Sequence, residues 1–256
     1  MLEGIHAVKH ALRFGAELSA LVGTEADELE RLAEALAPDL RGRFAAELQI
    51  VSPGTFSQLA PRAPRTGVIA IAIRPHVNLG QLLADPAGRP IVLLEDPRDL
   101  ANTGACVRVA VAADAAGVLT SGTQDPWHAD ALRGAAGLHF AVPVARVEEA
   151  SFHNRPLVAV DPRGAAFVPA RMPSRAVLAF GTERYGISDQ LLARADGCAS
   201  IPMRAGVSSL NLATSVAAIL FAWRLLATES AGSDANSHGI GQPSQQSFSS
   251  GRSEHP

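Results

Sequence analysis

Hydrophobic residues recur along the chain with two different spacings, which predict helices alternating with strands. In the first part of the chain, apolar positions at helical spacing predict helices over 4–14 and 25–36. Short apolar runs predict strands over 18–22, 48–51 and 68–73. The last run is apolar enough to lie inside a sheet rather than at its edge. This part of the chain therefore predicts a small α/β unit.

The pattern of apolar positions changes at residue 91. Apolar runs that predict strands now follow one another, and helical patterns lie between most of them: IVLLE (91–95), GVLTS (117–121), FAVPV (140–144), PLVAV (156–160) and AVLAFG (176–181). A further short strand is predicted to end at Ile201, before a long helix with one apolar side. Strands that alternate with helices are typical of a parallel α/β sheet.

Composition divides the chain into four regions. Residues 1–75 predict the smaller α/β domain, and 76–90 predict a linker, because three prolines flank one short helical pattern there. Residues 91–228 predict the main domain. Residues 229–256 are rich in Ser, Gly and Gln, which predicts a disordered tail.

The overall composition is that of a globular protein, with 47% hydrophobic and 18% charged residues. A net charge of −3 lacks the positive excess typical of a general nucleic-acid binder, although all basic residues except Lys9 are arginines that could form a local phosphate-binding patch. Two cysteines exclude a disulfide scaffold, and the opening residues show no secretory signal, so we expect a cytoplasmic protein. The uncharged stretch 205–223 approaches membrane-spanning length, but polar residues near its start favour a buried helix and no membrane association.

Three polar, glycine-containing segments follow predicted strands, at the sheet edge where parallel α/β proteins bind ligands. In the first, residues 95–110, Asn102 or Thr103 could cap a helix. That helix would present backbone N–H groups and the nearby guanidinium of Arg108 to one anionic group. A capped helix with a surface arginine explains the same residues.

The second segment, residues 181–188, has two glycines around Glu183, which permits a tight turn and a close approach of backbone to a ligand. An ordinary turn between a strand and a helix explains it equally well. In the third segment, residues 201–215, Ser208 or Ser209 could cap the long helix. Ser209 and Asn211 place polar side chains at the mouth of that helix, and core packing does not explain them.

In this order and spacing, the three segments resemble the motifs of the SpoU/TrmH branch of the SPOUT superfamily, which are S-adenosylmethionine-dependent RNA ribose 2′-O-methyltransferases. The opening EGIHAVKHAL (3–12) with TGVIAIAI (66–73) resembles the L30e-like RNA-binding domain attached to such enzymes. The resemblance implies an α/β fold whose C-terminal domain is tied into a deep trefoil knot. It also implies a homodimer in which each active site is completed across the interface.

When the family's functional positions are carried over to this sequence, the resemblance implies that Asn102 and Arg108 are the catalytic pair. It also implies that Ser209, Asn211 and Glu183 lie near the reacting groups. It implies that S-adenosylmethionine is held by these residues: Phe180, Gly181, Thr182, Glu183, Gly186, Ile201, Met203, Leu210 and Asn211. The chain departs from the family pattern after Arg108, where Val replaces a common Thr. It departs again after Asn211, where Leu-Ala-Thr replaces Val with small residues.

Methyl transfer to a ribose hydroxyl requires that the hydroxyl lose its proton. Arg108 either gives up a proton and acts as the base, or stays charged and stabilises the developing oxyanion. The second role is favoured because free Arg keeps its proton far above neutral pH. The target is expected to be structured RNA, and 23S rRNA rather than tRNA, because L30e-like modules bind kinked or looped RNA.

Other functions fit the sequence less well. A Rossmann enzyme would need G-x-G-x-x-G after an early strand, but the one G-x-G, at Gly239 and Gly241, lies in the tail. His6 and His10 have no partner motif that would indicate a metal, so none is expected. The remaining alternative is an RNA-binding protein that keeps the fold without catalysis, which would have no reason to bind S-adenosylmethionine.

Overall fold

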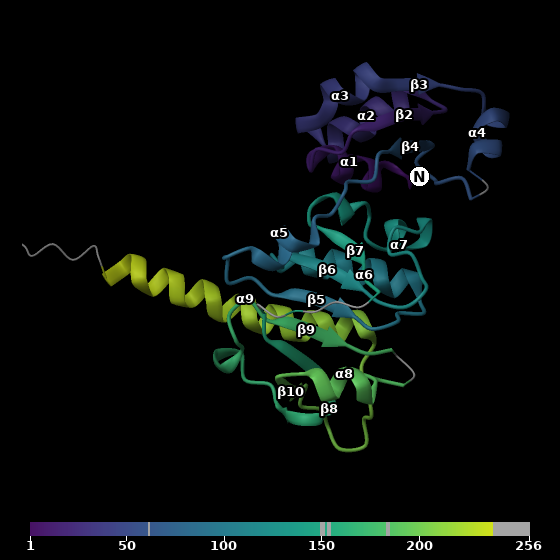
Figure 1. Cartoon of the computed structure of the whole chain (residues 1–256). Helices are drawn as coiled ribbons and strands as arrows, with labels where there is room; N and C mark the ends of the chain where they lie inside the picture. The colour runs from purple at the N-terminus through teal and green to yellow at the C-terminus, as the bar shows by residue number, and fades with distance from the viewer. Residues whose placement is uncertain (61, 149–151, 153–154, 183–184, 238–256) are drawn as a thin grey trace, which may run out of the picture.

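The computed structural model describes residues 1–60, 62–148, 152, 155–182 and 185–237, and the side chains of these up to residue 228. The described residues form two β-sheets, each with its own helices (Figure 1). The first sheet has the order β1-β4-β2-β3, with bounds Leu2–Glu3, Val68–Ala72, Leu18–Gly23 and Leu48–Ile50. Its helices are α1 (Ile5–Arg13), α2 (Ala26–Leu36), α3 (Arg41–Glu47) and α4 (Pro53–Leu59). The helices α1 and α2 and the strands β2, β3 and β4 confirm the predictions for this region, whereas β1, α3 and α4 were not predicted.

The strand predicted to be internal, β4, pairs antiparallel with β1 on one side and β2 on the other. Its first three residues, Val68, Ile69 and Ala70, are buried. Ala70 shares a buried cluster with α1, and Ile69 packs on Phe56 of α4. The side chain of Ile71 is exposed, so the helices that bury the first residues of β4 do not cover this position.

The second sheet is parallel throughout, as the alternating pattern predicted. Its order is β10-β8-β9-β5-β6-β7, with bounds Gly197–Ser200, Leu157–Ala166, Val177–Phe180, Ile91–Leu94, Gly117–Thr120 and Val144–Arg146. Its helices are α5 (Leu79–Ala84), α6 (Leu100–Ala112), α7 (Ala129–Gly134), α8 (Asp189–Arg194) and α9 (Leu212–Ser237). Helices cover both faces: Val92 and Leu94 are buried with α6 and α9, whereas Ile91 and Leu93 are buried with α5 and α8.

The strand predicted over 140–144 is wrong. Leu138–Phe140 is a 3₁₀ turn, and β7 begins only at Val144. Pro143 has no N–H to donate to a ladder, so it precedes the strand and its carbonyl accepts a hydrogen bond from Val118 (2.9 Å). The apolar side chain of Phe140 packs in the interior, where its ring and that of Trp127 meet edge to face with centroids 5.2 Å apart.

The segment expected to be a linker takes part in the second unit. It contains α5, whose Leu82 is buried in the same cluster as Ile91. The buried guanidinium of Arg155 fastens this segment by donating to the backbone carbonyls of Leu82, Leu83 and other nearby residues.

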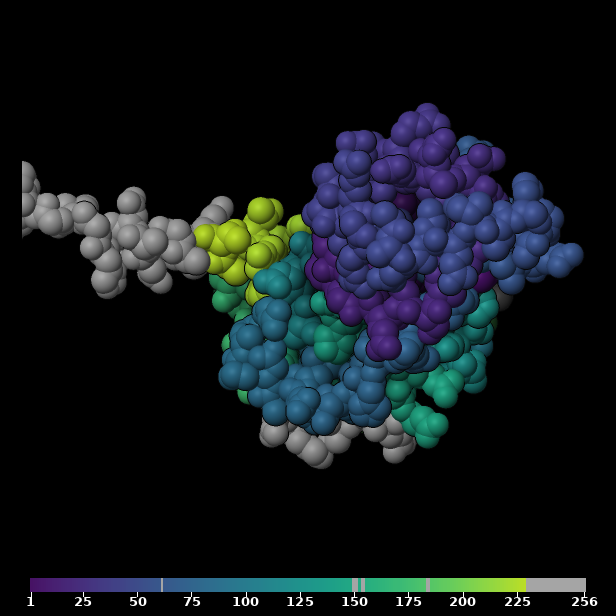
Figure 2. All heavy atoms as spheres, turned by 90° about the horizontal axis from the view of Figure 1, so that it is seen from above, coloured from purple at the N-terminus to yellow at the C-terminus, as the bar shows by residue number. Residues whose placement is uncertain are grey.

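The two units are also in contact. Figure 2 shows the N-terminal residues stacked on one end of the unit that holds the parallel sheet. Arg133 of α7 pairs with Glu3 of β1, and Nδ1 of His10 lies 2.8 Å from the carbonyl oxygen of Ala136. Residues 229–237, which we placed in a disordered tail, continue α9 as a helix that projects from the molecule (Figure 1). None of the described helices is long and apolar enough to cross a membrane.

Candidate functional site

The loops after β9 and β10, together with residues 160–163 of β8, meet the start of α9 at the carboxyl edge of the parallel sheet. They enclose a cavity of about 690 Å³, called here the main pocket. Eight residues proposed from the sequence line it: Phe180, Gly181, Thr182, Gly186, Ile201, Met203, Ser209 and Leu210. The second and third sequence segments are therefore brought together as expected.

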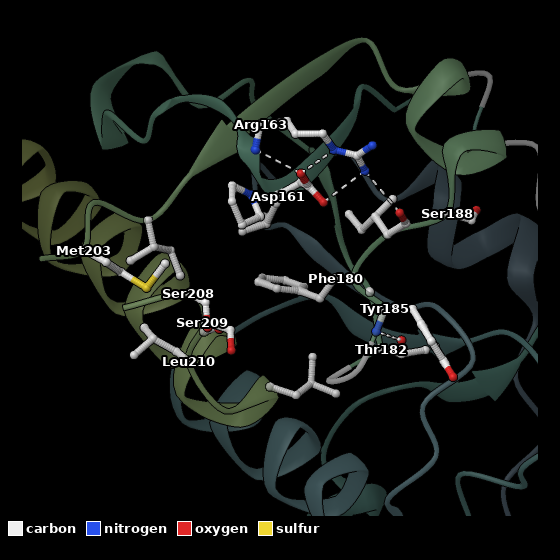
Figure 3. Close-up of a pocket in the computed structure, with 18 of the residues that line it drawn as sticks. Asp161, Arg163, Phe180, Thr182, Tyr185, Ser188, Met203, Ser208, Ser209 and Leu210 are labelled. Atoms are coloured by element: carbon white, nitrogen blue, oxygen red, sulfur yellow. Dashed lines mark hydrogen bonds and ion pairs between the residues drawn. The ribbon is translucent and has the colours of Figure 1, made fainter. Parts of the chain in front are cut away.

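The main pocket has two unlike sides. Figure 3 shows Met203, Ser208, Ser209 and Leu210 on one side and the turn carrying Thr182 and Tyr185 opposite, with Phe180 between them. The first side is largely apolar and includes Ile201 and Leu212. The opposite side offers backbone polar groups. Such a mixture suits a flat, heterocyclic ligand with polar edges.

A tight turn forms the polar side. The amide of Thr182 donates to the carbonyl of Gly186 (3.1 Å), and the amide of Gly186 donates back to Thr182 (2.9 Å). A Cβ on Gly181 would overlap the backbone of Gly186, and Gly186 itself has φ +68°. The turn therefore requires both glycines. Glu183, proposed from the sequence, lies outside the described residues.

The helix caps differ from those predicted. Asp99, not Asn102 or Thr103, caps α6, and its carboxylate accepts the amide of Asn102 (2.9 Å). Asn211, not Ser208 or Ser209, caps α9, and its Oδ1 accepts the amides at positions 213 and 214 (2.9 and 3.3 Å). In both cases the Asp or Asn nearest to the first helical residue reaches the free amides, as N-cap residues do.

The first and third segments are joined by a side-chain hydrogen bond. Nδ2 of Asn211 donates to Oδ1 of Asn102 across 3.0 Å. Neither residue lines the main pocket. Asn102 instead lines a second, more open hollow of about 890 Å³, together with residues such as Arg62, Arg98 and Arg133.

Arg108 does not line the hollow that Asn102 lines, and the pairing of the two residues in catalysis stays a prediction. Arg108 is exposed on α6 and lines neither hollow. The reason is helix geometry: at 3.6 residues per turn, positions six apart project about 120° away from each other and about 9 Å along the axis. Asn102 and Arg108 therefore project from different sides of α6.

The structure adds residues to the main pocket that sequence analysis missed. Asp161 and Arg163 follow the buried start of β8 and line the pocket (Figure 3). Asp161 is only 6% exposed, and Arg163 Nε donates to its Oδ1 (2.8 Å). The guanidinium of Arg163 lowers the pKa of Asp161, and that carboxylate in turn raises the pKa of Arg163. Their position directly after the predicted strand PLVAV was the available signal. Within the described part of the chain, no group of three His, Cys, Asp or Glu side chains could hold a metal.

Comparison with known proteins agrees with this geometry. The model of the SpoU rRNA Methylase family matches residues 89–221, which include the three segments. The chain belongs to the SpoU rRNA methylase family. The resemblance inferred from the three segments is therefore confirmed.

Similar SpoU-type proteins cover most of the chain. An uncharacterized tRNA/rRNA methyltransferase of Mycobacterium tuberculosis is 31% identical, over 84% of this chain and 77% of its own length. The 23S rRNA (guanosine(2553)-2′-O)-methyltransferase RlmP of Bacillus subtilis is 26% identical over 86% of both chains. The crystal structure of an AdoMet-bound rRNA methyltransferase from Sinorhizobium meliloti superposes with a TM-score of 0.69 at 26% identity, covering 88% of this chain and 86% of that one. The trefoil knot and the L30e-like assignment stay predictions.

Proposed function

We propose that this protein methylates a ribose 2′-hydroxyl of 23S rRNA, with S-adenosylmethionine as the methyl donor. The observation that carries the proposal is the convergence of the family's second and third segments on the main pocket, with the third also bonded to the first through Asn102 and Asn211. The relatives named as 23S rRNA 2′-O-methyltransferases support the same chemistry and favour rRNA over tRNA.

The main pocket fits S-adenosylmethionine by size and chemistry. About 690 Å³ lies within the range of sites for ligands of this size. Ile201, Met203 and Leu210 would contact the adenine faces, and backbone groups of the Thr182–Gly186 turn would meet its polar edge. The missing Cβ of Gly181 lets the backbone of Gly186 and Ile187 pack against it, which gives the turn the shape that lines the pocket. When bound, this cofactor supplies an electrophilic methyl group on a sulfonium.

Asn211 takes a role different from direct cofactor contact. Both ends of its amide are engaged, Oδ1 by the start of α9 and Nδ2 by Asn102. We propose that Asn211 orients the Asn102 amide, and that Asn102 in the second hollow orients the ribose. Alignment of reacting groups supplies a large part of the rate enhancement in such a displacement.

We propose that Arg108 acts in the active site of a second protomer. It is exposed and lies off both hollows of its own chain, which supports a homodimer whose sites are completed across the interface. A guanidinium that keeps its proton would stabilise the developing 2′-oxyanion. The N-terminal unit would hold the RNA as an L30e-like domain.

Incubation with methyl-labelled S-adenosylmethionine and separated 23S rRNA and tRNA tests the proposal. We expect label in 23S rRNA at one nucleotide, where resistance of the next phosphodiester to alkali shows 2′-O-methylation. Arg108→Ala should abolish transfer and keep cofactor affinity. Label on a base, label in tRNA alone, or binding of rRNA without affinity for the cofactor would refute the assignment.

A further inference from the structure

The pocket turn is anchored from both neighbouring strands. Strand β9 lies between β8 and β5, and the turn follows it directly. On the β8 side, Arg163 Nη2 donates to the carbonyl oxygen of Ile187 (3.2 Å). On the β5 side, the carboxylate of Glu95 accepts the amide (2.8 Å) and the hydroxyl of Ser188. Both anchors hold the two residues that come immediately after Gly186.

The Arg163 anchor is itself rigidly held. Its Nε donates to Asp161 (2.8 Å), and its Nη1 donates to Asp189 (2.9 Å). The backbone amide of Arg163 also donates to Asp161 (3.0 Å), so the carboxylate is fixed to the same short segment. A planar guanidinium that is already bonded to several acceptors loses little further conformational freedom when it forms one more hydrogen bond. It is therefore suited to position another group.

The turn depends on these anchors because none of its described residues, 181, 182, 185 and 186, is fully buried. The side chain of Tyr185 is 80% exposed. Within the turn, Thr182 and Gly186 exchange backbone hydrogen bonds, and the Tyr185 amide donates to Thr182 Oγ1 (3.0 Å). A displacement of Ile187 would move the carbonyl of Gly186, and with it the polar side of the main pocket.

We infer that Arg163, oriented by Asp161, is a positioning residue for the cofactor: it holds the turn in its binding geometry before the ligand arrives. This role rests on the proposed function. A preformed turn spares the ligand the entropic cost of ordering it, so the effect belongs to cofactor affinity rather than to the chemical step. Burial of Asp161 without its partner would also be unfavourable, which keeps the pair together.

The test compares Arg163→Met and Arg163→Lys with the wild type. We expect calorimetry to show S-adenosylmethionine binding about tenfold weaker in Arg163→Met, which corresponds to about 1.4 kcal/mol. Turnover at saturating cofactor should stay within about twofold of wild type. Arg163→Lys should recover part of the affinity, since an ammonium keeps the charge without the fork. In the absence of cofactor, the Ser188 amide should exchange hydrogen faster in Arg163→Met.

Two further variants separate positioning from general stability. Arg13→Met removes a two-point Arg–Asp pair with Asp39 in the N-terminal unit and should leave cofactor affinity unchanged. Asp189→Asn removes the negative charge of one exposed partner of Arg163, so it should fold normally and weaken cofactor binding by about twofold to threefold.

Some results would overturn the inference. These are wild-type affinity in both Arg163→Met and Asp189→Asn, equal loss in Arg13→Met, or reduced turnover at saturating cofactor with affinity unchanged. If the wild type methylates RNA while these variants bind normally, the positioning role alone fails. If the wild type binds no S-adenosylmethionine, the proposed function fails with it.

Discussion

Acid should destabilise this protein through one buried histidine, His139. Its side chain is fully buried beside Trp127, with ring centroids 5.1 Å apart. Nε2 lies 2.8 Å from the carbonyl oxygen of Pro126, to which it can only donate. Nδ1 has no hydrogen-bond partner among the residues that the structure describes. A proton on Nδ1 would therefore place an unpaired N–H and a charge in the interior.

The size of the effect follows from the pKa difference between the two states. Burial lowers the pKa of His139 from 6.5 to about 4. The unfolded chain takes up this proton first as the pH falls, so stability decreases with falling pH between about 6.5 and 4. Each unit of pKa difference is worth about 1.4 kcal/mol, so the full loss is about 3 kcal/mol.

Urea unfolding followed by tryptophan fluorescence at pH 7.5 and pH 4.5 measures this loss. We expect the wild type to lose most of this unfolding free energy between the two pH values. The loss should be much smaller in His139→Gln, since an amide does not titrate. Some dependence should remain, because burial also lowers the pKa of His10. His128→Gln, which changes an exposed histidine nearby, should keep the wild-type dependence. Identical pH dependence in wild type and His139→Gln would refute the reasoning.

Three further substitutions test the site. Gly181→Ala should weaken cofactor binding by about tenfold or more, because its methyl group overlaps Gly186; undiminished affinity by calorimetry would contradict this. Asn211→Ala should lower stability by about 1 kcal/mol and reduce kcat/KM for RNA more than it changes cofactor affinity, since it removes both the α9 cap and the bond to Asn102. Unchanged RNA kinetics would count against that role. Asp99→Ala should lower the free energy of unfolding by about 1 kcal/mol in urea titrations, and a stability equal to wild type would exclude its capping role.

The fold was predictable where the signal was local. The parallel sheet followed from buried strands such as β5 and β9, whose residues are apolar on both faces and need no partner to be recognised. The two glycines of the pocket turn were likewise visible in the sequence. The strand expected over 140–144 failed because Pro143 sets the strand start, and this one residue outweighs the apolar run before it.

The caps and the second wall of the pocket were not predictable, because several residues offered the same local chemistry. Asp99 and Asn102 are both residue types that cap helices. The structure shows that Asp99 caps α6, whereas the side chain of Asn102 bonds to Asn211, 109 positions away. Similarly, Asp161 and Arg163 alone resemble a simple turn. Their importance depends on Ile187 reaching them, which requires the adjacency of β8 and β9 that the sequence does not state.

The relative placement of Asn102 and Arg108, the proposed catalytic pair, also could not be read from the sequence, and it affects the expected assembly of the active site. A sequence motif that contains Asn102 and Arg108 suggests one site, yet their projection from α6 differs by about 120°. The hydrogen bond to Asn211 fixes Asn102 toward its own third segment, while Arg108 stays exposed away from the main pocket. We propose that, where both residues act on one ribose, they come from different copies of the chain. Mixing Arg108→Ala with Asn102→Ala protomers should then restore sites that contain both side chains, and heterodimers without activity would disprove the shared site.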